Sequence, residues 1–109
     1  MRASSIDGVL VLAVRGELDA FTAPQLAEAI DNGIAASLTA LIVDLSEVAF
    51  LASAGMTVLV TGHETARRSE KRFMVVADGP ATSRPMMLTG LDQAVSLYPT
   101  LDAALKDVV

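Results

Sequence analysis

The chain has 109 residues, of which 52% are hydrophobic and 19% are charged. This length suits one domain rather than two, and the apolar fraction is far above that of disordered chains, so we expect the chain to fold alone around a core. Eight Lys and Arg against thirteen Asp and Glu give a net charge of −5, which repels phosphate backbones and disfavours direct binding to nucleic acid.

The first predicted elements form a hairpin. Residues 9–14 are apolar at every position, which is typical of a strand covered on both faces. Gly8 and Gly16 mark the ends of this strand. Asp7 and Gly8 form a two-residue type I′ turn signal, so we expect residues 4–6 to be a short antiparallel partner strand.

A helical period begins after Phe21. Thr22 and Gln25 match a capping box, Phe21 and Leu26 are spaced for a hydrophobic staple, and Pro24 is tolerated in the first turn. The sequence therefore predicts a helix of about three turns. Its apolar face is formed by Leu26, Ala29, Ile30, Gly33 and Ile34.

The middle of the chain predicts a βαβ unit. Residues 41–43 are an apolar strand, residues 45–51 are expected to be irregular, and residues 73–76 are a third strand. Parallel neighbours joined by a right-handed crossover follow from this order. The helix between them begins near Ser53 and frays in the polar run 67–72. One of its faces carries Met56, Leu59, Val60 and His63.

Smaller elements complete the chain. Pro85 is tolerated only in a first helical turn, so a short helix is expected over residues 83–89, and Gly90 ends it. Residues 95–98 predict a weak strand, and Thr100 is expected to cap a closing helix that reaches residue 108. The predicted fold class is α/β: a single domain over residues 1–109, with an open, mixed but mostly parallel β-sheet flanked by α-helices.

Chemistry-bearing patterns are scarce. The absence of cysteine excludes disulfides, cysteine-ligated zinc and thiol catalysis, and no glycine-rich phosphate loop is present. No small-residue cleavage site follows the first apolar run, and no apolar stretch approaches the roughly 20 residues that span a bilayer. We therefore expect a cytoplasmic protein without a signal peptide, without membrane insertion and without cofactors.

Three candidate sites receive structural interpretations instead. His63 and Glu64 begin a zincin-like pattern that lacks its second histidine, so we interpret His63 as a boundary residue and expect no metal. Glu17, Asp19 and Asp44 fall near strand ends, but paired-acid hydrolysis needs a cleft that this small domain disfavours, so we expect no enzyme. The basic cluster of Arg67, Arg68, Lys71 and Arg72 is interpreted as a solvated helix end.

One feature supports a functional hypothesis. Ser53, Ala54 and Gly55 open the second helix, and such small residues let another surface approach the backbone. Ser53 is expected at or next to the N-cap, beyond the carboxyl end of strand 41–44, where open α/β sheets place their sites. A phosphoryl group there would meet free N–H groups and add about −1.5 to −2 charges, which can displace a docked partner. The alternative is a serine with only a capping role.

Six short motifs follow one another along the chain: residues 16–19, 22–24, 43–46, 50–56, 88–91 and 98–101. Their order resembles that of the STAS domain of the bacterial anti-sigma factor antagonist family. The resemblance covers nearly the whole chain and implies a central sheet flanked by helices. It further implies that the unphosphorylated protein binds an anti-sigma factor of the serine kinase type and frees a sigma factor. By the same resemblance, phosphorylation of Ser53 is expected to reverse the binding and a phosphatase to restore it.

The resemblance also implies which residues face the partner. The family often has Asp directly before the acceptor serine, whereas this chain has Ala52. Two alternatives remain open: a STAS module of a stress-sensing scaffold or a lipid-transporter complex that needs no phosphate on Ser53, and a small-ligand or nucleotide-binding domain. The expected partner-binding residues are Asp19, Ala20, Phe21, Thr22, Ala52, Ser53, Ala54, Gly55 and Met56.

Overall fold

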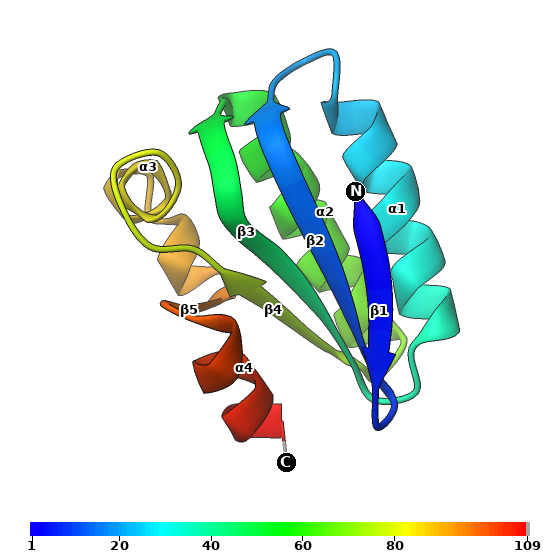
Figure 1. Ribbon diagram of the computed structural model, residues 1–109. Coiled ribbons are helices and arrows are strands. Elements are labelled where there is room, and N and C mark those ends of the chain that lie inside the picture. The colour runs from blue at the N-terminus through cyan, green and yellow to red at the C-terminus, as the bar shows by residue number, and fades with distance from the viewer. Residues whose placement is uncertain (109) are drawn as a thin grey trace.

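The computed structural model describes residues 1–108, and Figure 1 shows the arrangement of their helices and strands. Every predicted helix and strand is present, several with different ends. In chain order they are β1 (Arg2–Ile6), β2 (Val9–Leu18), α1 (Ala23–Ala36), β3 (Ala40–Leu51), α2 (Ser53–Arg68), β4 (Arg72–Val76), α3 (Ser83–Leu88), the 3-10 helix η1 (Leu91–Gln93), β5 (Ser96–Tyr98) and α4 (Leu101–Val108).

The five strands form one sheet in the order β1-β2-β3-β4-β5. Strand β1 is antiparallel to β2, and all other neighbours are parallel, which confirms the predicted mixed sheet. At the β1–β2 turn, Asp7 has φ 50° and Gly8 has φ 84°. Positive φ at both central positions is the requirement of a type I′ turn, so the predicted hairpin is confirmed.

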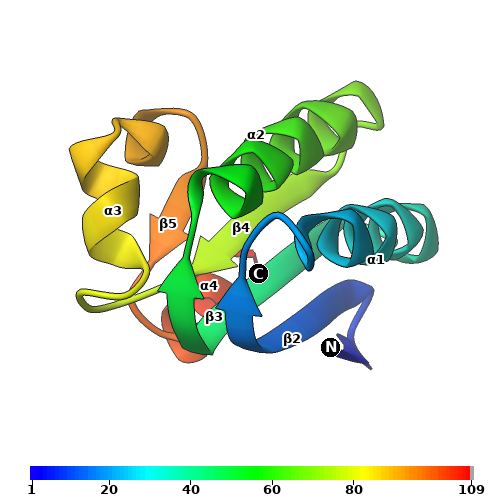
Figure 2. The ribbon, with the colours of Figure 1, turned by 90° about the horizontal axis from the view of Figure 1, so that it is seen from above.

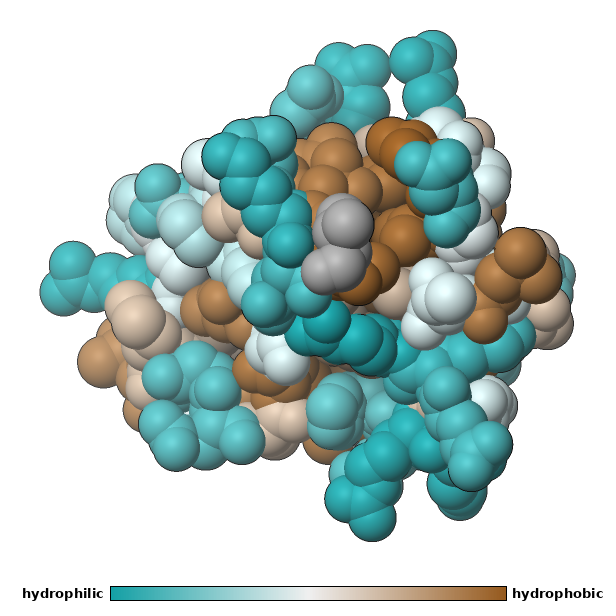
Figure 3. Space-filling model, turned by 90° about the horizontal axis from the view of Figure 1, so that it is seen from below, coloured by the Kyte–Doolittle hydropathy of each residue, from teal (hydrophilic) through white to brown (hydrophobic). Residues whose placement is uncertain are grey.

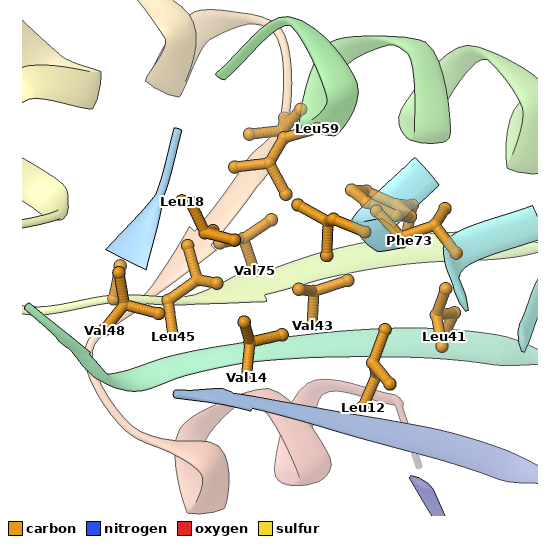
Figure 4. Packing of buried hydrophobic residues seen from close by; sticks show 14 of the residues in the cluster. Leu12, Val14, Leu18, Leu41, Val43, Leu45, Val48, Leu59, Phe73 and Val75 are labelled. Atoms are coloured by element: carbon orange, nitrogen blue, oxygen red, sulfur yellow. The ribbon is translucent and has the colours of Figure 1, made fainter. Parts of the chain in front are cut away.

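Helices cover both faces of the sheet. Helices α1 and α2 lie together on one face, and α4 lies on the other (Figures 1 and 2). Figure 4 shows the larger core, in which Leu59 of α2 lies over strand residues such as Val43 and Val75. On the opposite face Val11, Ile42 and Met74 pack with α4. Burial on both faces explains why residues 9–14, 41–43 and 73–76 are apolar at every position.

The buried strip of α2 differs from the predicted face. Leu59 is fully buried as expected, but Met56, Val60 and His63 are only half-buried. The buried positions on either side of Leu59 are held by Gly55, Gly62 and Ala66. Small residues allow α2 to lie close to α1 and to the sheet. Within residues 1–108, no helix combines the length and apolar character needed to cross a membrane.

Strands β2 and β3 run further than predicted. Strand β2 continues past Gly16 to Leu18, and β3 includes residues 45–51, which we expected to be irregular. The pairing of β2 with β3 shifts register between Ala13 and Arg15 and again between Gly16 and Glu17. These irregularities break the alternation of inward and outward side chains, so the buried residues of this segment do not follow a strand period.

Candidate functional site

The two segments of the expected partner-binding surface, residues 19–22 and 52–56, lie where β2 and β3 end and α1 and α2 begin. Figure 2 shows this edge of the sheet from above. The backbone N–H of Ala52 donates to the carbonyl of Leu18 at 2.8 Å, which ties the end of β3 to the end of β2. Ala52 is the N-cap of α2 in an extended conformation, and Ser53 is the first helical residue. The loop from Asp19 to Thr22 therefore lies at the same edge as Ser53.

Hydrogen bonds hold the loop before α1 in a tight turn. The N–H groups of Phe21 and Thr22 donate to Asp19 Oδ1 at 2.9 and 3.1 Å. The Thr22 hydroxyl accepts from the N–H of Asp19 at 2.8 Å and donates to the carbonyl of Glu17 at 2.9 Å. The pKa of Asp19 lies below its ordinary value, and the largest cause is the hydrogen bond from the backbone N–H of Thr22. A carboxylate is thus kept ionised beside the start of α2.

This turn overturns two sequence-based expectations. Thr22 makes no side-chain capping bond to α1, because its hydroxyl is engaged by the end of β2 and its backbone is already helical. The capping box with Gln25 is therefore wrong. Phe21 is 89% exposed, so its ring does not pack on the buried Leu26 and the hydrophobic staple is also wrong. Instead, Phe21 presents a large apolar surface to solvent.

Ser53 is exposed at the start of α2. Within residues 1–108, its hydroxyl has no hydrogen-bond partner, while its carbonyl accepts from the Thr57 hydroxyl at 3.1 Å. Gly55 makes this helix start possible, because a Cβ there would lie 2.9 Å from Leu51 Cδ1 and 3.0 Å from Leu18 Cβ. The small residue lets α2 begin directly on the strand ends, with Ser53 facing outward.

A groove that sequence reasoning missed adjoins Ser53. It has a volume of about 370 Å³ and separates the first half of α2 from the end of α3 and η1. The Thr89 hydroxyl lies 3.7 Å from Met56 Sδ across it. The only sequence signal was the motif at residues 88–91, which carries part of the family resemblance. The lining includes Ser53, Met56, Val60, Thr89, Leu91 and Ala94.

Exposed apolar side chains gather on the elements of this edge. Phe21 precedes α1, Phe50 lies near the end of β3, and Met87 and Leu88 are the last residues of α3. Leu88 is 77% exposed. The opposite end of the molecule, seen from below in Figure 3, carries projecting hydrophilic side chains as well as apolar surface, and Leu38 at the hairpin end is 78% exposed. Grouped exposed apolar side chains are typical of surfaces that bind other molecules.

The remaining candidates lie apart from this edge or have structural contacts. His63 is half-buried with its ring edge-on to Phe73, at a centroid distance of 6.3 Å, as expected of a boundary residue. Asp44 accepts hydrogen bonds from Ser46 and lines a separate cavity of about 330 Å³. Asp44 and Asp19 thus have different surroundings. Residues 1–108 contain no group of three or more His, Cys, Asp or Glu that could hold a metal ion.

Half of the basic cluster has structural contacts rather than being solvated as predicted. Lys71 Nζ donates to the carbonyl of Ile34 at 2.5 Å, in the last turn of α1. Arg72 Nη2 lies 2.9 Å from Asp107 Oδ2 and so fastens α4 to the start of β4. The hydrogen bond that Arg72 donates to the Asp107 carboxylate raises the pKa of Arg72, and burial raises the pKa of Tyr98 beside it. Arg67 and Arg68 end α2 in solvent.

Known proteins are similar to this chain in both sequence and fold. The STAS domain family model matches residues 1–104. Over 102 residues, 94% of this chain and 83% of the relative, the sequence is 46% identical to the anti-sigma-F factor antagonist RsfB of Mycobacterium tuberculosis. The crystal structure of an anti-sigma factor antagonist from Mycobacterium paratuberculosis has a TM-score of 0.90 at 48% identity, covering 98% of this chain and 91% of that one.

The phosphorylated form of the Bacillus cell fate determinant SpoIIAA is similar in fold, with a TM-score of 0.72 at 18% identity over 99% of this chain and 98% of that one. The two mycobacterial relatives are antagonists of regulatory factors rather than enzymes. The family match spans nearly all of the described residues and includes the edge that carries Ser53. The chain therefore belongs to the STAS domain family and, within it, to the anti-sigma factor antagonists.

Proposed function

We propose that this antagonist, when unphosphorylated, binds an anti-sigma factor of the serine kinase type and so frees a sigma factor. The binding surface consists of residues 19–22 and 52–56, and phosphorylation of Ser53 ends the binding. The observation that carries the proposal is the exposed, unpartnered Ser53 hydroxyl at the first residue of α2, beside the Asp19 turn. A phosphatase returns the protein to its binding form.

The start of α2 suits a phosphoryl acceptor. The first N–H groups of a helix have no acceptor within it, and the helix dipole favours an anion there. Ala52, which stands where the family often has Asp, has no side chain that could accept hydrogen bonds from these N–H groups. The same N–H groups therefore remain available to the phosphoryl oxygens.

Electrostatics account for the loss of binding. A phosphoryl group adds about −1.5 to −2 charges to a chain that already carries −5. The added charge stands at the same edge as the Asp19 carboxylate, which is ionised at neutral pH and whose pKa the turn lowers further. A partner surface that fits the neutral serine would have to desolvate or neutralise the new dianion, which costs affinity.

The test combines modification and binding. Incubation with the cognate kinase and ATP should add one phosphate, which mass spectrometry should locate on Ser53. Thr57, an exposed hydroxyl one turn further along α2, supplies the control, because Thr57→Ala should leave that phosphate unchanged. No phosphate, or phosphate on another residue, would refute the switch.

Binding to the anti-sigma factor is measured in parallel. Ser53→Ala should keep the wild-type affinity, and Ser53→Glu should weaken binding even though Glu carries only one negative charge. Equal affinities of the two variants would count against Ser53 lying in the interface. Co-purification with membrane proteins instead of a small ATP-binding protein would favour the transporter role.

A further inference from the structure

The groove beside Ser53 is open, and its lining is largely apolar. Met56 and Val60 of α2 face Leu91 and Ala94 across it, and its volume is about 370 Å³. Met56 is half-buried, and its flexible thioether side chain can adapt to different apolar groups. The wall opposite α2 includes Thr89. The residue before it in the sequence, Leu88, is 77% exposed.

We propose that this groove is a second part of the anti-sigma factor docking site and takes an apolar side chain of that partner. The inference rests on the proposed function, which places the partner over Ser53. The groove is continuous with that surface because Ser53 itself lines it. A macromolecular partner fits better than a small ligand, because a ligand confined to the groove would leave the adjacent apolar surface of Met87 and Leu88 exposed.

The groove also gives the phosphoryl switch a local cause. A partner side chain that enters it removes water from its rim, and Ser53 forms part of that rim. Neutral serine tolerates this loss of water at modest cost, whereas a phosphoryl dianion without a compensating cation does not. The same insertion that strengthens binding of the unmodified protein therefore weakens binding of the phosphorylated one.

Filling the groove from its own wall tests the proposal. Ala94 is exposed and lines the groove, so Ala94→Phe should occupy the space that the partner needs. Ala35, an exposed alanine near the far end of α1, supplies the matched control Ala35→Phe. Titration with the purified anti-sigma factor of the same cell should show affinity about tenfold or more weaker for Ala94→Phe and unchanged for Ala35→Phe.

A second pair of variants guards against misfolding of the first. Leu88→Asp should weaken binding, whereas Leu38→Asp should not. Leu38 is equally exposed (78%) but lies at the hairpin end of the molecule, where its backbone N–H donates to the carbonyl of Gly8. All four variants should melt within about 3 °C of the wild type, as expected for exposed positions. Wild-type affinity in both Ala94→Phe and Leu88→Asp would overturn the groove proposal alone. Failure of the wild-type chain to bind the anti-sigma factor would overturn the proposed function and the groove with it.

Discussion

Two buried helical glycines should respond oppositely to the same substitution. At Gly62 of α2, a new Cβ would lie 2.9 Å from Ile30 Cγ2 and 3.0 Å from Phe73 Cε2. At Gly33 of α1, the nearest atom would be Leu41 Cδ1 at 3.0 Å, followed by Leu10 Cδ2 at 3.2 Å. The contacts at Gly62 are a branched methyl next to the main chain and a rigid ring, whereas those at Gly33 are the far ends of flexible leucines.

The expected change in the free energy of unfolding at each glycine follows from two opposing effects. Replacing glycine by alanine inside a helix contributes about 1 kcal/mol of stability, while overpacking a core costs about 1–3 kcal/mol. At Gly62 the rigid neighbours cannot move aside, so we expect Gly62→Ala to destabilise the fold by about 1 kcal/mol overall. At Gly33 the leucine ends can shift, so Gly33→Ala should be neutral or stabilising by up to about 0.5 kcal/mol.

Urea unfolding followed by circular dichroism measures both values. A loss of about 1 kcal/mol corresponds to a fall in Tm of about 4–8 °C for a domain of this size. The reasoning would be refuted if Gly62→Ala were as stable as the wild type, or if Gly33→Ala lost as much stability as Gly62→Ala. The first result would mean that α2 shifts away from α1 without cost, and the second that the leucine ends at Gly33 are as constrained as the Phe73 ring.

Two further predictions concern hydrogen bonds. Because the folded-state pKa of Asp19 lies below the ordinary 3.8, its ionised form stabilises the turn above that pH, and the stabilisation is lost as pH falls through the folded-state pKa. On acidification, Asp19→Asn should therefore lose less free energy of unfolding than the wild type. Equal losses in the two proteins as the pH falls would contradict this. Thr100 Oγ1 accepts from the N–H of Ala103 at 3.1 Å, so Thr100→Ala should cost about 1 kcal/mol in urea unfolding, and an unchanged midpoint would argue against the cap.

Local sequence determined most of the elements and the position of Ser53 at the start of α2. Asp7 and Gly8 predicted the hairpin because a two-residue turn with positive φ needs those residue types. Thr100 predicted the start of α4, and the small residues that open α2 predicted a helix start at or next to Ser53. Each of these features depends on backbone preferences within a few neighbouring residues, so the linear order of side chains is sufficient to predict them.

The tertiary structure decided how these elements contact one another. The Thr22 hydroxyl bonds the end of β2 rather than α1, which a local capping pattern cannot reveal. The groove joins Met56 to Thr89, residues 33 positions apart in the chain. Their contact depends on how α2 and α3 pack against the same sheet, and the free energies that select this packing arise between distant segments. Sequence patterns report the apolar face of each helix, but not which neighbour leaves part of that face open to a partner.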